Sequence, residues 1–219
     1  SGVIEMSSSS RLVPHVLAEL PYSVAQMAVL DCGCGYGRWG RAVRSRRGGR
    51  EAFVVGSEIF ERYALASRLS TSYDELVLCD IRRVPFRHGS FDLVLACEVI
   101  EHMDKQDGIR FLRHLKLVAK RRVIVTTPNG YYPQGAADEN IFQVHRSTWS
   151  VSDLRKLDFR VKGVGLFIVG PPSTLPSIVR RPLWLVAEAF ARISELGPIA
   201  RLLKIFPRIG AFLLSVGDR

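Results

Sequence analysis

In this 219-residue sequence, the residues most suited to bind a ligand are an acid and a series of glycines that follow a short apolar stretch. Asp31 comes directly after the apolar residues 27–30, and Gly33, Gly35 and Gly37 follow it at alternate positions. Glycine lets a backbone turn tightly and approach a ligand without a Cβ between them. A strand, a glycine loop and a helix in this order form the place where open α/β sheets bind nucleotide-like ligands.

Three interpretations of this loop remain open. Gly35-x-Gly37-x-x-Gly40 matches the fingerprint of dinucleotide-binding loops, which is a weak signal by itself. Asp31 argues against a dinucleotide, because a carboxylate at a strand end repels a pyrophosphate, whereas it suits a ligand with an ammonium and a sulfonium. An ordinary glycine-rich turn between a strand and a helix is the third interpretation.

Two further acids end the next two apolar stretches. Glu58 lies about twenty residues after the glycine loop, where an acid accepts hydrogen bonds from both ribose hydroxyls of a bound nucleoside. Asp80 and Ile81 suit an adenine, since the carboxylate accepts from the exocyclic amine and the isoleucine packs on the ring. The alternatives are a solvent-exposed acid for Glu58 and a plain turn residue for Asp80.

The elements that must position these residues alternate between strand and helix. Strands are predicted at residues 27–30, 53–58, 76–80, 93–97, 122–127, 159–169 and 211–217. Helices are predicted at residues 11–20, 38–47, 62–70, 109–119 and 152–157. This alternation predicts an α/β protein with a Rossmann-like, doubly wound sheet and right-handed crossovers.

Several motifs in one order make the sequence resemble a known family. They are Asp31-x-Gly33-x-Gly35-x-Gly37, Asp80-Ile81, Val84-Pro85-Phe86, Ser90-Phe91-Asp92-Leu93-Val94 and Glu101-His102. Together they resemble the type-11 group of class I S-adenosylmethionine-dependent methyltransferases, over residues 27–165 and again at the end of the chain. The resemblance implies seven strands, mostly parallel with the last one antiparallel, and S-adenosylmethionine as cofactor. Cys97-Glu98 departs from the small or polar residues common in the group at this place.

The predicted cofactor-binding residues come from all of these stretches. They are Asp31, Gly33, Cys34, Gly35, Gly37, Glu58, Ile59, Asp80, Ile81 and Cys97. No metal site is predicted, because no histidine or cysteine pair has the spacing of a usual zinc site.

A long loop over residues 127–147 follows a predicted strand and therefore faces the ligand side of the sheet. We expect Tyr131 and Tyr132 to contact the substrate. His145 is the candidate general base, since the usual pKa of a histidine lies near working pH; a structural histidine that fixes the loop is the alternative. His102 is interpreted as structural or substrate-facing rather than as a metal ligand.

The chain is predicted to form one domain over residues 1–219, with a helical lead-in at 1–26 and a helical insertion at 170–210 before the final strand. The insertion holds several prolines and a basic helical face, and is expected to pack on the domain as a helical cap that also serves as a lid over the substrate. Contact of residues 180–206 with a membrane surface is the alternative.

The composition bounds the partners and the compartment. No apolar run reaches the length that spans a bilayer, and the four cysteines are expected to be small buried residues in a reducing cytoplasm. A net charge of +10 favours an anionic partner, such as a nucleic acid, acidic lipid headgroups or an anionic substrate; a solvated basic surface without a partner is the alternative. The predicted function is methyl transfer to an oxygen, nitrogen or carbon atom of a small molecule. An RNA or protein acceptor, and a cofactor-binding protein without catalysis, are the alternatives.

Overall fold

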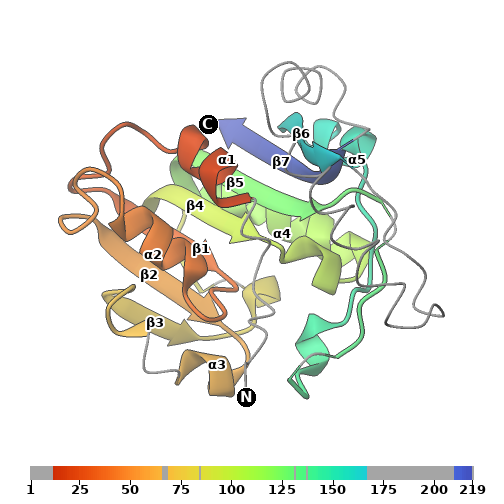
Figure 1. The fold of residues 1–219 in the computed structure, drawn as a ribbon, viewed down its shortest axis with the longest axis horizontal. Coiled ribbons are helices and arrows are strands. Elements are labelled where there is room, and N and C mark those ends of the chain that lie inside the picture. The colour runs from red at the N-terminus through yellow and green to blue at the C-terminus, as the bar shows by residue number, and fades with distance from the viewer. Residues whose placement is uncertain are drawn as a thin grey trace, which may run out of the picture.

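The computed structural model of this protein describes residues 12–65, 69–83, 85–130, 132–136, 138–166 and 210–218. In this part of the chain, a seven-stranded sheet has the order β3-β2-β1-β4-β5-β7-β6 (Figure 1). The strands are β1 (Ala28–Cys32), β2 (Phe53–Glu58), β3 (Glu75–Leu78), β4 (Phe91–Cys97), β5 (Ala119–Pro128), β6 (Arg160–Leu166) and β7 (Gly210–Asp218).

The sheet confirms the predicted mixed topology. β1 to β5 pair in parallel, whereas β7 lies antiparallel between β5 and β6. The α/β prediction of seven strands with an antiparallel last strand is therefore correct.

The described helices are mostly shorter than the sequence predicts. They are α1 (Leu12–Glu19), α2 (Arg38–Arg44), α3 (Glu61–Ala64), α4 (Lys105–Val118) and α5 (Val151–Arg155), with short 3-10 turns η2 (Ile81–Arg83), η3 (Ile100–His102) and η4 (Ile141–Gln143). The predicted helix at 62–70 is one turn, α3, in the described residues, and α4 begins a turn earlier than predicted.

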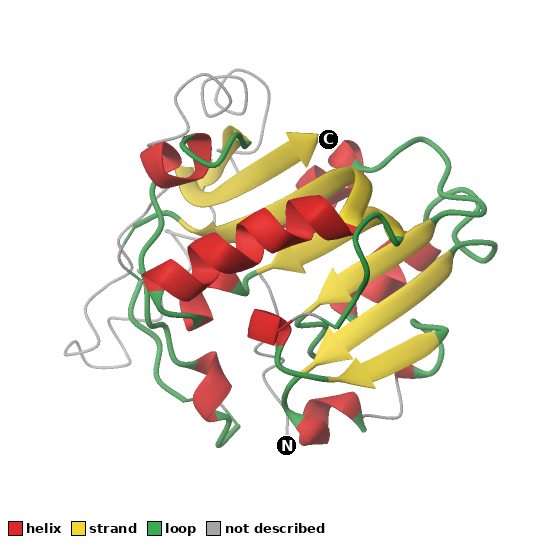
Figure 2. Ribbon diagram, turned by 180° about the vertical axis from the view of Figure 1, so that it is seen from behind, coloured by secondary structure: helices red, strands yellow, loops and turns green. Residues whose placement is uncertain are grey.

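Two apolar cores cover the two faces of the sheet. On one face, α1 and α2 pack Val16, Trp39 and Val43 against alternate strand residues such as Val29. On the other face, α4 packs with α5, and β1 contributes Leu30. Figures 1 and 2 show these opposite faces, with α1 and α2 in front in the first and α4 in front in the second. Apolar burial on both faces is what an α/β sheet with parallel strands requires.

The parallel strands bring their carboxyl ends to one edge of the sheet. Glu58 ends β2, Cys97 ends β4, and the glycine loop follows β1, so residues far apart in sequence meet there. This edge is where open α/β sheets hold their ligands. It is the edge at which the sequence predicts the site.

Some predictions fall outside the described residues. These are residues 1–11 of the helical lead-in, residues 170–209 of the insertion with the membrane contact at 180–206, and Tyr131. Among the residues that are described, no helix has the length and apolar character needed to cross a membrane.

Candidate functional site

The glycine loop after β1 presents one open position to the ligand edge. Gly33, Gly35 and Gly37 all have positive φ, at 68°, 49° and 77°. A Cβ at Gly33 would lie 2.8 Å from Val99 Cγ2, and one at Gly37 would lie 2.7 Å from Leu69 Cδ2. A Cβ at Gly35 would meet nothing within 4 Å. Gly33 and Gly37 therefore permit close packing, whereas Gly35 leaves space for a ligand.

Glu58 connects the end of β2 to this loop. Its Oε2 accepts a hydrogen bond from the Gly35 N–H at 2.9 Å, and its Oε1 accepts from Ile59 N–H and Phe60 N–H, both at 2.9 Å. A carboxylate has about four acceptor positions. The geometry leaves room for about one further donor, at Oε2, so the predicted pair of ribose hydroxyls cannot both bind without a change in these contacts.

Asp31 is the predicted residue whose surroundings differ most from expectation. It is 0% exposed, and its Oδ2 accepts from Tyr73 Oη at 2.6 Å, while Tyr73 Oη accepts from the Gly40 N–H at 3.2 Å. Burial, opposed by the Tyr73 hydrogen bond, raises the pKa of Asp31 to about 7. No hydrogen-bond partner for Asp31 Oδ1 is present in the described part of the chain. The carboxylate thus lies behind the loop and acts on the site through its charge and through Tyr73.

Asp80 forms a local ion pair at the far end of the cleft. Its Oδ2 accepts from Arg82 Nη2 at 2.6 Å, and its Oδ1 accepts from the Arg82 N–H at 2.9 Å. The hydrogen bond from Arg82 holds the pKa of Asp80 below its usual value. An ion pair at a partly exposed position contributes little stability, so a ligand amine can compete for this carboxylate.

Two adjoining cavities collect most of the predicted cofactor-binding residues. One, of about 200 Å³, is lined by Gly35, Glu58, Ile59, Asp80 and Ile81 among others. The other, of about 260 Å³, includes Cys34, Cys97, Tyr132 and His145 in its lining. Both are lined by Gly33, Gly35 and Glu98, which makes them parts of one cleft along the carboxyl edge. Asp31 and Gly37 line neither cavity.

The cysteines of the site are structural in this geometry. Cys32, Cys34 and Cys97 are buried, and Cys79 is partly exposed, in contrast to the prediction that all four are buried. Burial raises the pKa of the Cys34 and Cys97 thiols, so neither is a thiolate at neutral pH.

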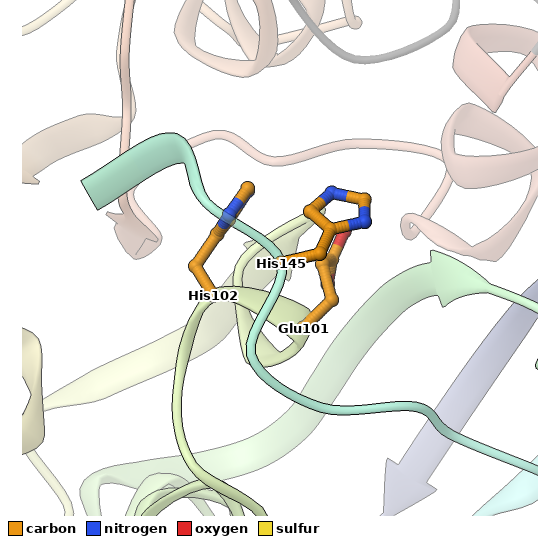
Figure 3. Close-up of side chains that lie close together, drawn as sticks. All are labelled: Glu101, His102 and His145. Carbon is orange, nitrogen blue, oxygen red and sulfur yellow. The ribbon is translucent and has the colours of Figure 1, made fainter. Parts of the chain in front are cut away.

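The inner end of the cleft brings His145 beside Glu101 and His102 (Figure 3). The His102 and His145 ring centroids are 4.9 Å apart. Burial and the neighbouring His145 lower the pKa of His102 to about 4, and burial lowers the pKa of His145. Burial together with the Glu98 carboxylate raises the pKa of Glu101 well above its usual range. Both imidazoles are therefore neutral at pH 7.

Contacts between η3 and the end of the loop place His145 there. The backbone carbonyl of Glu101 accepts from the Arg146 N–H at 2.7 Å and from the Ser147 N–H at 3.1 Å. Trp149 Nε1 donates to the Ile100 carbonyl at 3.2 Å, and Trp149 forms isolated bridges with Asn129 and Gly130 at the end of β5. These bonds hold the loop against the carboxyl edge of the sheet.

The same loop is also bound to the opposite wall of the cleft. Asp138 Oδ2 accepts from Tyr63 Oη at 2.9 Å and from Tyr36 Oη at 3.2 Å. The two tyrosine rings pack with centroids 4.4 Å apart and line the inner cavity. The loop, described at residues 132–136 and 138–149, is therefore held on both sides of the cleft.

A wider cavity lies outside His145. Its volume is about 780 Å³, and Tyr132, Gln134 and His145 line both it and the inner cavity. Arg146 adds positive charge to its wall, where Lys105 is ion-paired with Asp153 at 2.9 Å. Small-molecule sites commonly have volumes of about 300–1,000 Å³. An acceptor of that size can reach the inner cleft from this side.

Sequence reasoning missed several residues of the cleft. Glu98 lines both cavities with φ of 59°, which is unusual for a residue other than glycine. Its only signal in the sequence is the Cys97-Glu98 departure from the family pattern. Gln143, Arg146 and Glu101 also line the cleft, and Glu101 was quoted as part of a motif without a role.

Comparison with known proteins finds a family model and a curated relative that are similar to this chain. Residues 29–122 match the sequence model of a family described as a methyltransferase domain. An uncharacterized protein of Methanocaldococcus jannaschii is 25% identical over 190 residues, which span 85% of this chain and 76% of that protein.

Solved structures share the fold at lower identity. One is a structure of a complex between the Haloferax volcanii Trm112 methyltransferase activator and a methyltransferase, with a TM-score of 0.60 and 19% identity over 95% of this chain and 88% of that chain. Another is the magnesium protoporphyrin IX methyltransferase of Synechocystis with bound SAH, with a TM-score of 0.57 and 14% identity over 95% of this chain and 82% of that chain. At these identities the likeness concerns the fold.

Proposed function

We propose, on the premise that this chain has the domain and the fold of a class I S-adenosylmethionine-dependent methyltransferase, that it methylates a small polar molecule held beside His145. The family model over residues 29–122 and the shared fold support the class I assignment, the enzyme class and the methyl donor, whereas the type-11 group stays a prediction. The observation that carries the proposal is the single cleft that runs from Asp80 past Gly35 to His145.

The shape of the cleft and its hydrogen-bonding groups suit S-adenosylmethionine. Gly35 leaves open the space that a Cβ would fill, and Glu58 keeps about one acceptor position for a ribose hydroxyl. Asp80 and Ile81 offer a carboxylate and an apolar surface to an adenine at the end of the cleft that lies away from His145. The methionine portion would then lie between the glycine loop and Cys97.

Methyl transfer requires mainly alignment from the protein. When bound, the donor supplies a methyl group on a sulfonium, so the bond from acceptor to carbon forms as the carbon–sulfur bond breaks and its electron pair stays on sulfur. Holding the acceptor in line can supply much of the acceleration. His145 can take the acceptor proton at Nε2, because its Nδ1 is bonded to the Tyr132 carbonyl.

The acceptor side favours a small polar molecule. The outer cavity of about 780 Å³ is of small-molecule size, and Gln134, Lys105 and Arg146 provide hydrogen-bond donors along its wall. The second candidate is an RNA acceptor, which the net charge of +10 favours. Binding of RNA that weakens steeply with salt would support this candidate, and no binding at low salt would remove it.

Thermal unfolding with the donor and its product tests the proposal. We expect S-adenosylmethionine and S-adenosylhomocysteine to raise the melting temperature, while NAD has no effect. At a hundredfold excess of ligand over Kd, the free energy of unfolding should increase by about 2.7 kcal/mol. Glu58→Ala should lose the shift. Glu61→Ala removes an exposed acid three residues away and should keep it. Equal shifts in both variants, or no shift in the wild type, would refute the proposed site.

A further inference from the structure

Three side chains at the inner end of the cleft converge in the manner of a metal site. The candidate ligand atoms of Glu101, His102 and His145 all lie within 4.8 Å of one another. Figure 3 shows the two imidazoles and the carboxylate gathered between η3 and the loop that carries His145. Bonds of about 2.1 Å in a tetrahedron would bring such atoms to about 3.4 Å, which small side-chain movements can reach.

Each of the three side chains is oriented by a further hydrogen bond. His102 Nδ1 lies 3.3 Å from the Val144 carbonyl, and His145 Nδ1 is bonded to the Tyr132 carbonyl. A carbonyl only accepts hydrogen bonds, so Nδ1 carries the proton in both rings and Nε2 presents its lone pair. Glu101 Oε2 accepts from Thr127 Oγ1 at 3.0 Å. Metal-binding histidines and carboxylates have second hydrogen bonds of this kind.

The cluster also lies where a cation could contact the methyl acceptor. All three residues line the inner cavity together with Gly35 and Cys97, so they face the place where the methyl group would be transferred. Glu98 lines the same cavity. A cation there would be attracted by the Glu98 carboxylate at the same wall of the cavity.

We propose that Glu101, His102 and His145 bind a first-row divalent cation, and that an oxygen atom of the methyl acceptor completes its coordination. Two imidazoles and one carboxylate suit Zn²⁺, Co²⁺ or Mn²⁺ better than Ca²⁺ or Mg²⁺. Three protein ligands leave an open position, as in catalytic rather than structural sites. The sequence predicted no metal, because His145 is remote in the chain from the adjacent pair Glu101-His102.

The second half of this inference rests on the proposed function and narrows the substrate to a hydroxyl-bearing acceptor. A cation lowers the pKa of a hydroxyl bound to it. The acceptor oxygen then loses its proton to water in the open outer cavity, and its electron pair forms the bond to the methyl carbon. In this arrangement Nε2 of His145 holds the cation, so water replaces His145 in the role of proton acceptor that the proposed function assigns to it in the cation-free cleft.

Titration of the chelator-treated protein with Co²⁺ tests the site directly. We expect one equivalent to bind, with visible absorption bands from nitrogen ligation, and binding at least ~100-fold weaker in both His145→Ala and His102→Ala. His88→Ala is the control, since His88 also packs against a second histidine, His114, but lies on an exposed turn. Absence of binding in the wild type, or equal binding in His145→Ala and His88→Ala, would overturn the site.

A parallel measurement separates this inference from the proposed function. S-adenosylhomocysteine should stabilise the chelator-treated wild-type protein as it stabilises the Co²⁺-loaded protein, because the cofactor contacts assigned to Gly35 and Glu58 do not involve the cation. If Co²⁺ binds but S-adenosylhomocysteine does not stabilise the wild type, the metal site stands and the methyltransferase proposal fails. If both bind and a chelator leaves the rate of methyl transfer unchanged, the role of the cation in holding the acceptor is refuted.

Discussion

Gly35 and Gly130 form a matched pair that tests where the cofactor lies. Both have positive φ, at 49° and 84°, and a Cβ at either position would meet nothing within 4 Å. An alanine at either position therefore costs only the left-handed backbone strain, of about 1–2 kcal/mol. In a chain of this length, 1 kcal/mol shifts the melting temperature by about 2–4 °C. We expect Gly35→Ala and Gly130→Ala to lose about 2–8 °C each without ligand.

The two variants should differ once ligand is added. Gly35 lines both cavities of the cleft, so its new methyl group would occupy space that the proposed cofactor needs. We expect at least tenfold weaker binding of S-adenosylhomocysteine by calorimetry in Gly35→Ala, or about 1.4 kcal/mol. Gly130→Ala should bind as the wild type does. Equal affinities in the two variants would show that the ligand does not pass over Gly35, and the reasoning would fail.

Three substitutions test the contacts that support the glycine loop and the loop that carries His145. Asp31→Asn should stabilise the ligand-free protein at pH 8 but not at pH 4, because burial raises the Asp31 pKa from 3.8 to about 7 and the folded state loses stability as pH rises between these values. At pH 8 the buried Asp31 charge lowers the free energy of unfolding by about 4 kcal/mol, whereas an unpaired amide in its place would lower it by about 1–3 kcal/mol. Urea unfolding of Asp31→Asn should therefore show a free energy of unfolding about 1–3 kcal/mol higher than that of the wild type; a lower value at pH 8 would contradict this. Tyr73→Phe removes the donor to Asp31 and the acceptor for Gly40 and should cost about 2–3 kcal/mol in the same assay, so an unchanged midpoint would contradict these contacts. Gly108→Ala would place a Cβ 2.5 Å from Trp149 Cζ2 and should lower the melting temperature despite better helix propensity; an unchanged or higher melting temperature would contradict the close packing of this ring.

Local patterns were sufficient to predict the sheet edge. Apolar stretches that end in Asp31, Glu58 and Cys97 predict buried parallel strands, and the observed strands end within two residues of the predicted ends. Because parallel strands end at one edge, the meeting of Glu58, Asp80 and Gly35 followed from the order of elements. The antiparallel direction of β7 was predicted from the family resemblance and not from a local pattern.

Long-range contacts explain what the sequence did not reveal. Asp31 is covered by Tyr73, 42 residues further along, and no local pattern predicts that hydrogen bond. The approach of His145 to Glu101 depends on Trp149 and the backbone of η3, which the sequence does not relate to each other. The positive φ of Glu98 is likewise a product of the tertiary fold.

The attachment of the loop to Asp138 has a consequence for the rate at which the protein works. Asp138 joins the loop to Tyr36 and Tyr63 on the far wall, so a nucleoside inside the cleft lies under a strap fixed at both ends. In the proposed binding mode, a ligand that passes this strap requires the two tyrosine hydrogen bonds to break. In enzymes with such closures, release of product rather than bond chemistry often limits turnover. If the proposed binding mode holds, the residence time of the product is coupled to two phenol groups to which the proposed reaction assigns no role.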